Sequence, residues 1–143
     1  MTHKDAGHYS DKHGADVRPD ERVAAAVREK AKGGKITCAE AERTGAGLGV
    51  ALAEIGRTID LLELRIARCQ LGLFGYPDGK AIPPVATVDP ELEAAIRKGL
   101  AGGRLPCKAA WEIAAGRKIP RMGVSSACEA LKLRIKPCQL GAF

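Results

Sequence analysis

Apolar residues recur at helical spacing in two stretches of the chain that lie 69 residues apart. In the first stretch, three apolar side chains at intervals of four positions fall on one face of a helix expected at residues 21–32. The second stretch repeats this spacing and predicts a helix at residues 90–101. A glycine pair follows each pattern, at Gly33-Gly34 and at Gly102-Gly103, and glycine is common just beyond a helix C-terminus. Both helices are therefore expected to end there.

A further set of elements follows each of these helices in the same order. A short apolar segment leads into a second helix, a turn leads into a third, and a β-branched segment typical of a strand closes the unit. These segments are expected at residues 35–36, 38–44, 51–63 and 64–66, and again at residues 104–105, 107–115, 120–132 and 133–135. The order predicts a mainly α fold with short strands.

The two stretches form an internal repeat. Residues 23–74 align with residues 92–143 without a gap, and 18 of the 52 aligned pairs are identical. The ends match most closely, with LRIARCQLGLF in the first stretch and LRIKPCQLGAF in the second. A unit of this length is short for an independent domain, so we expect two units packed as a pair related by a pseudo-twofold axis.

The residues outside the repeats lack this pattern. Residues 75–89 join the repeats at residues 21–74 and 90–143, and their prolines and turn dipeptides predict a semi-rigid linker. Residues 1–20 show no apolar periodicity, which predicts a disordered or loosely held tail.

The second and third helices of each repeat resemble a helix-turn-helix. In that motif a small residue lets the two helices approach, a short turn joins them, and an aliphatic residue fills the angle between them. These features correspond to Gly45, Gly49-Val50-Ala51 and Ile55 in the first repeat, and to Ala114, Lys118-Ile119-Pro120 and Val124 in the second. With the flanking strands, each repeat resembles a reduced winged helix, which implies a tandem DNA-binding fold. Lys118 departs from the motif, because glycine is preferred at its position.

Charge is distributed unevenly along the 143 residues. The formal net charge is +6, and residues 92–143 contain ten Lys or Arg against three Asp or Glu. A compact basic segment attracts polyanions such as nucleic acid, although a basic surface can also serve only for solvation. No apolar run is long enough to cross a membrane, and the charged N-terminus lacks the apolar core of a secretory signal. We therefore expect a cytoplasmic protein without a membrane partner.

The two repeats differ in the charge of their third helix, the expected recognition helix. Glu54, Asp60 and Glu63 in the first repeat would repel phosphates, whereas basic and hydroxyl side chains accompany the helix of the second. The second repeat is therefore expected to contact DNA, as part of a transcriptional regulator or a nucleoid-associated protein. The expected DNA-binding residues are Arg104, Lys108, Arg117, Lys118, Arg121, Ser125, Ser126 and Lys132.

A second interpretation treats the repeats as a protein-interaction module. The first repeat would then form a homodimer or hold a protein partner, and the cysteines could respond to redox state or to metal. An enzyme is not expected, because the sequence has no paired carboxylates, no phosphate-binding glycine loop and no nucleophile with a base in reach.

Four cysteines occupy matching positions of the two repeats. Cys38 and Cys107 fall in the first turn of a helix, where a thiolate is stabilised. Cys69 and Cys138 follow the closing strands. Three interpretations stay open for the four: packing residues, a redox pair in each repeat, or ligands of a metal ion or iron–sulfur cluster. There is no C-x-x-C motif, no other cofactor is expected, and Cys128, which aligns with an isoleucine, is expected in the core.

Overall fold

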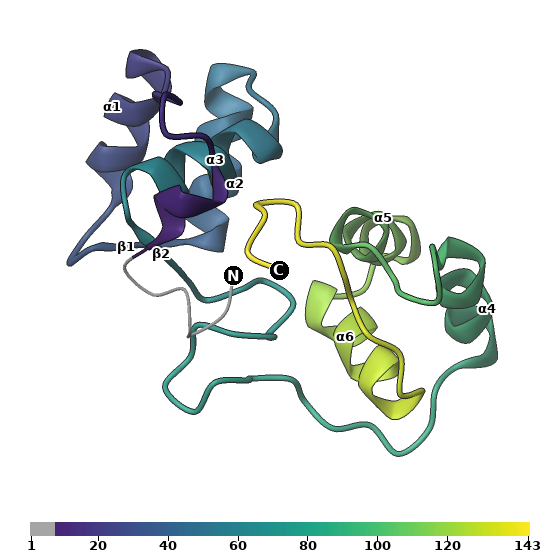
Figure 1. Ribbon diagram of the computed structural model, residues 1–143. Coiled ribbons are helices and arrows are strands. Elements are labelled where there is room, and N and C mark those ends of the chain that lie inside the picture. The colour runs from purple at the N-terminus through teal and green to yellow at the C-terminus, as the bar shows by residue number, and fades with distance from the viewer. Residues whose placement is uncertain (1–7) are drawn as a thin grey trace. The chain divides into compact units, whose positions relative to one another are not determined.

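The computed structural model describes residues 8–143, which contain six α-helices and a small two-stranded parallel sheet (Figure 1). The mainly α class with short strands, predicted from the sequence, is confirmed. The chain divides into two compact units. Unit 1 contains the described residues up to Cys69 together with Gln139–Phe143, and unit 2 contains Gln70–Cys138.

Unit 1 places a parallel strand pair beside three α-helices. The middle residues of the two strands, Ile36 and Ile66, lie opposite each other, and both side chains are buried. In chain order, the elements of the unit are η2 (Tyr9–Lys12, a 3₁₀-helix), α1 (Glu21–Lys30), β1 (Lys35–Thr37), α2 (Cys38–Leu48), α3 (Leu52–Leu61) and β2 (Arg65–Ala67).

Polar residues at the helix starts explain where α1 and α2 begin. The Asp20 carboxylate accepts hydrogen bonds from the backbone N–H groups of Arg22 and Val23. At the end of β1, the Thr37 hydroxyl accepts a hydrogen bond from the Glu40 backbone N–H, and the Glu40 carboxylate accepts one from the Thr37 backbone N–H. A hydrogen bond from the Thr37 hydroxyl to the Glu40 carboxylate is the main reason that the pKa of Glu40 lies below its ordinary value. The strand therefore passes directly into α2.

Unit 2 repeats this order of elements. Its helices are α4 (Pro90–Gly99), α5 (Cys107–Arg117) and α6 (Arg121–Ala130), and each begins 69 residues after its counterpart in unit 1. Leu105 and Ile135 form a single parallel bridge at the positions that correspond to the centre of the unit 1 strand pair. The predicted helices are confirmed in both units, while the predicted strands of the second repeat are reduced to this bridge.

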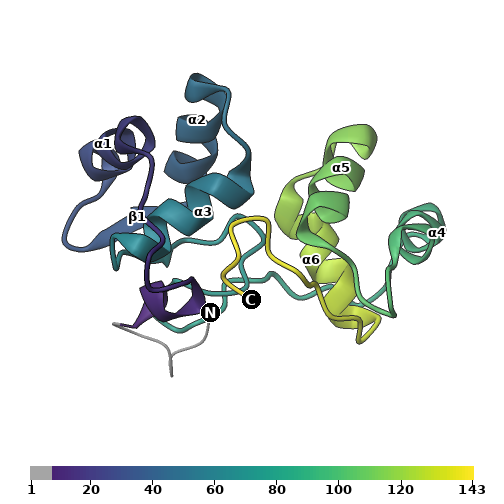
Figure 2. The same cartoon turned by 45° about the horizontal axis from the view of Figure 1, so that its top comes forward.

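The three α-helices of each unit lie beside one another (Figure 2). Aliphatic side chains are buried in both units. In unit 1, α1, α2 and α3 pack against one another around Val27, Ile55 and Ile59, which are fully buried. In unit 2, α4, α5 and α6 pack in the same way around Ile96 and Val124. The aliphatic residues expected to fill the helix-turn-helix angle, Ile55 and Val124, therefore lie in these cores.

The turn between the second and third helices of each unit contains a residue in the left-handed conformation. Gly49 has φ +67° in unit 1, and Lys118 has φ +57° in unit 2. Glycine adopts this conformation without steric cost, whereas a residue with a Cβ atom is destabilised there by roughly 1 kcal/mol. The turn is thus the same in both units although Lys118 departs from the preferred glycine.

The tail of each repeat lies in the unit formed by the other repeat. The sequence assigns residues 139–143 to the second repeat, but the structure places them in unit 1, where Leu140 is buried. Residues 70–74, at the end of the first repeat, belong instead to unit 2, where Leu71 is buried. The predicted unit boundaries are therefore corrected at both tails.

The described part of the N-terminal segment packs on α3. Tyr9, in η2, has only 2% of its surface exposed, and its backbone N–H donates a hydrogen bond to Glu63. The prediction of a disordered or loosely held tail is therefore wrong for residues 9–13, because a buried aromatic ring and polar contacts fix them. Its first seven residues lie outside the described residues.

Candidate nucleic-acid interface

The helix expected to enter a DNA groove is α6, and its central residues are buried. Ser125 and Ser126 have only 1% and 2% of their surface exposed. The Ser126 hydroxyl donates a hydrogen bond of 2.5 Å to the carbonyl oxygen of Pro83, which lies in the segment expected to be a linker. Both serines are among the expected DNA-binding residues, and neither lies on an exposed face of the helix.

Arg121, at the start of α6, is held by other residues of unit 2. Its guanidinium lies over the Trp111 ring, 3.7 Å from the ring centroid. It also donates a hydrogen bond of 2.9 Å to the side-chain oxygen of Gln70. Arg121 is therefore engaged within the unit, and its side chain is only partly exposed.

Residues 70–83 contact α6 along its length. Gln70 bonds to the start of the helix, Pro83 accepts from Ser126 near its middle, and Lys80 forms an ion pair of 3.4 Å with Glu129 near its end. Part of the predicted linker is therefore packed against unit 2. Base reading by the middle of α6 would require this segment to leave the helix.

The remaining predicted DNA-binding residues lie around α5 and beyond α6. Arg117 forms ion pairs with Asp89 at 3.1 Å and with Glu91 at 3.4 Å, at the start of α4. The other four are exposed and form no ion pair with any of residues 8–143: Arg104, Lys108, Lys118 and Lys132.

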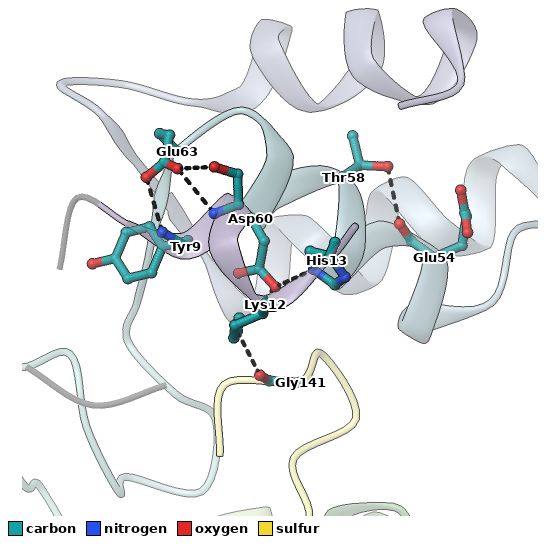
Figure 3. Close-up of polar contacts among 9 residues, drawn as sticks. Tyr9, Lys12, His13, Glu54, Thr58, Asp60, Glu63 and Gly141 are labelled. Atoms are coloured by element: carbon teal, nitrogen blue, oxygen red, sulfur yellow. Dashed lines mark hydrogen bonds and ion pairs between the residues drawn. The ribbon is translucent and has the colours of Figure 1, made fainter. Parts of the chain in front are cut away.

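In unit 1, the corresponding helix α3 is covered by the N-terminal segment (Figure 3). The Glu63 carboxylate accepts hydrogen bonds from the backbone N–H groups of Tyr9, at 3.0 Å, and of the residue that follows it, at 2.9 Å. Asp60, which is 3% exposed, lies 2.9 Å from the Lys12 Nζ and 3.0 Å from the His13 Nε2. Two of the acidic residues expected to repel DNA, Asp60 and Glu63, therefore hold the N-terminal segment on α3.

The C-terminal tail covers another part of α3. The Lys12 Nζ donates a hydrogen bond of 3.0 Å to the carbonyl oxygen of Gly141 (Figure 3). The Leu140 backbone lies so close to Gly56 that a Cβ atom there would overlap it. The third helix is thus covered by neighbouring chain segments in unit 1 as well as in unit 2.

Four exposed cations of unit 2 gather at the strand bridge and the first turn of α5. We call them the basic cluster: Arg104, Lys108, Arg134 and Lys136. The Leu105 N–H donates to the Arg134 carbonyl at 2.9 Å, and the Lys136 N–H donates to the Leu105 carbonyl at 2.8 Å. These bonds bring the two chain segments together, and Lys108 follows in α5. None of the four cations forms an ion pair with any of residues 8–143.

The basic cluster is stronger than its counterpart in unit 1. Lys35 and Arg65 correspond to Arg104 and Arg134, but alanines stand at the positions of Lys108 and Lys136. Arg134 and Lys136 were not among the residues expected to bind DNA. Their alternation with the buried Ile135 is the period of a strand, and this signal could have identified them.

The repeat-matched cysteines lie where the strands meet the helices. The Cys107 backbone N–H donates a hydrogen bond of 3.0 Å to the carbonyl oxygen of Pro137, the residue before Cys138. Within residues 8–143, no three His, Cys, Asp or Glu side chains come together as a candidate metal site. Cys128 is buried as predicted, and burial raises the pKa of its thiol to about 11. Of the matched cysteines, three are buried and the last is partly exposed: Cys38, Cys69, Cys107 and Cys138.

None of the helices in residues 8–143 combines the length and the apolar character needed to cross a bilayer. Comparisons with protein-family models, with curated proteins and with solved structures found no match.

Proposed function

We propose that this protein binds duplex DNA through the basic cluster of unit 2, chiefly by contacts to phosphates. The observation that carries the proposal is the gathering of four exposed cations, none of them paired within residues 8–143, at a strand bridge and a helix N-terminus. Arginine and lysine side chains bind phosphate oxygens, and the N–H groups of a first helical turn favour an anion nearby.

The charge balance of unit 2 supports this choice. Unit 2 carries eleven Lys or Arg and six Asp or Glu. Four of the six acidic residues pair with cations outside the basic cluster: Asp89 and Glu91 with Arg117, Glu93 with Arg97, and Glu129 with Lys80. The four cations of the basic cluster therefore have no carboxylate partner among residues 8–143.

Each unit is proposed to be a reduced winged helix whose third helix is turned away from DNA. The order of three helices and the parallel pairing that brackets the second and third of them support this assignment. The coverage of α6 by residues 70–83 argues against base reading by that helix. A sequence-tolerant, nucleoid-associated role therefore fits better than that of a regulator with a defined operator.

The test compares two double variants, each of which loses two positive charges. Arg134→Ala/Lys136→Ala removes half of the basic cluster, and Lys30→Ala/Arg43→Ala removes two exposed cations from unit 1. Binding to a fluorescent duplex of mixed sequence is measured by anisotropy at moderate salt. We expect the cluster variant to bind roughly tenfold more weakly or worse, because it loses two charge-assisted contacts, and the control to bind nearly as the wild type does.

A third variant separates this surface from the helix-turn-helix face. Lys118→Ala/Arg121→Ala changes the turn and the start of α6, and we expect a smaller loss than in the cluster variant. A larger loss of DNA affinity than in the cluster variant would indicate that the DNA site lies at α6. Equal binding by all variants would favour the protein-interaction interpretation, and the search would then turn to partners of unit 1.

A further inference from the structure

We propose that Cys107 and Cys138 form a disulfide when the protein meets a hydroperoxide. The inference is independent of DNA binding and concerns a modification site in unit 2. It begins from the hydrogen bond of 3.0 Å between the Cys107 backbone N–H and the Pro137 carbonyl oxygen. Standard bond lengths on either side of that bond place the two cysteine Cα atoms at most about 7 Å apart. Disulfides join Cα atoms separated by about 4.4–6.8 Å, so the Cα separation of this pair is compatible with a disulfide.

The surroundings of this pair favour reaction with an oxidant. Cys107 is the first residue of α5, next to Lys108, and Cys138 follows two positions after Lys136. The thiolate is the form of cysteine that reacts with a peroxide, and access of the peroxide to the sulfur decides which thiol reacts first. Cys138 is partly exposed, whereas Cys107 is 6% exposed, so a peroxide reaches Cys138 first.

The reaction consumes one peroxide for each disulfide. The Cys138 thiolate attacks one oxygen of hydrogen peroxide, the O–O bond breaks, and a sulfenic acid and a hydroxide are formed. The hydroxide takes up the proton that the thiol released and becomes the first water. The Cys107 sulfur then attacks the sulfenic sulfur, the S–O bond breaks, and a second water leaves. The two thiols together lose two electrons and two protons, and the peroxide is reduced to two waters.

Unit 1 holds the matched control for this site. Cys38 and Cys69 occupy the same positions of the repeat, but both are buried, at 7% and 6% exposed. Ala39 and Ala67 replace the flanking lysines, and Arg68 replaces Pro137, so the difference in exposure is what separates the two pairs. The proposal therefore predicts that the two pairs differ in their response to peroxide. Cys128 is a further control, since it is 1% exposed in the core.

The experiment treats the full, reduced chain briefly with hydrogen peroxide, alkylates the remaining thiols under denaturing conditions, and maps tryptic peptides by mass spectrometry. We expect residues 105–108 linked to residues 135–143, with the loss of two hydrogens, and the other three cysteines alkylated. A link between residues 36–43 and 69–80 that forms as readily would overturn the proposal. So would alkylation of both Cys107 and Cys138 after treatment, or a sulfinic acid at Cys138 with Cys107 still alkylated.

A single variant checks the order of the two steps. In Cys107→Ser, we expect the sulfenic acid at Cys138 to persist and to be captured by dimedone, with no cross-link formed. In Cys38→Ser, the link between Cys107 and Cys138 should form as in the wild type. Circular dichroism establishes that each variant is folded, and if Cys107→Ser is not, the wild-type peptide map alone decides. Absence of dimedone labelling in folded Cys107→Ser would contradict the sequence of steps.

Discussion

Gly56 on α3 lies directly against the backbone of Leu140, although the two residues belong to different repeats of the sequence. A Cβ atom at position 56 would overlap the Leu140 carbonyl group, so glycine is required there by close approach and not by its own backbone conformation. Leu140 is 3% exposed. This close contact therefore packs the C-terminal tail against α3 of unit 1.

Gly56→Ala is expected to destabilise unit 1. The new methyl group must displace the tail or shift α3, and overpacking of this kind costs about 1–3 kcal/mol. Gly47→Ala is the matched control, because Gly47 lies in α2 with no atom within 4 Å of an added Cβ, and alanine stabilises a helix interior by up to about 1 kcal/mol relative to glycine. Urea unfolding monitored by circular dichroism measures both. Equal effects of the two substitutions would contradict the close packing of the tail.

The N-terminal segment is expected to be released from α3 at acidic pH. Hydrogen bonds from the Ser10 hydroxyl and backbone N–H are the main reason that the pKa of Glu63 is lowered from 4.5. A lowered pKa stabilises the folded state above pH 4.5, and that stabilisation is lost as the pH falls through the lower, folded pKa. The amide resonances of Tyr9 and Ser10 should therefore shift together with a midpoint below 4.5.

The control for this titration is a pair of charge-neutralising variants. Glu63→Gln should abolish the shared shift of these two amide resonances, whereas Glu29→Gln, at an exposed position of α1, should leave it unchanged. If both resonances kept their titration in Glu63→Gln, another carboxylate would have to anchor the segment.

The two buried serines of α6 are expected to respond differently to alanine. The Ser126 hydroxyl donates to the Pro83 carbonyl, so Ser126→Ala should cost about 1 kcal/mol and loosen the segment that covers α6. The Ser125 Oγ is buried and has no hydrogen-bond partner among the described residues. Ser125→Ala should therefore be neutral or stabilising, because it removes an unsatisfied polar atom. Thermal unfolding measures the stability of both variants. A greater loss of stability in Ser125→Ala than in Ser126→Ala would contradict the prediction.

The stability of unit 2 should decline at alkaline pH because of Cys128. Well below pH 9 the thiol is neutral in both the folded and the unfolded state. Between pH 9.0 and about 11 the unfolded state ionises while the buried thiol does not, so stability falls as the pH rises through this window. Cys128→Val, which introduces a β-branched residue where the first repeat has Ile59, should show a smaller decline between pH 8 and pH 10 in urea unfolding. If the stability of Cys128→Val declined as much as that of the wild type, groups other than Cys128 would be responsible.

The sequence predicts the helices of this protein well because their signals are local. Spacing of apolar residues and the glycine pairs indicate a first helix at residues 21–32, and α1 is found at Glu21–Lys30. The tails could not be assigned in the same way. The Cys-Gln-Leu-Gly motif occurs in both repeats, so its local pattern is compatible with packing on either unit, and only tertiary contacts such as that between Gly56 and Leu140 decide.

The candidate site shows the same division between local and tertiary information. Hydroxyl side chains normally indicate a solvated helix face, yet Ser125 and Ser126 are buried, and the Ser126 hydroxyl bonds to Pro83, which is distant in the sequence. The excess of positive charge was evident in the sequence. The basic cluster forms only because Leu105 pairs with Ile135, and these residues are 30 positions apart in the chain.

The central claim, DNA binding through the basic cluster, is tested most directly by the salt dependence of the affinity. Each phosphate contact contributes about −0.9 to the slope of log K against log salt concentration, so four contacts predict a wild-type slope near −4. In Arg134→Ala/Lys136→Ala the slope should become shallower by about 2, whereas Lys30→Ala/Arg43→Ala should keep the wild-type slope. Identical slopes for the wild type and the cluster variant would contradict the claim, because the cations of the cluster would then release no counterions from DNA.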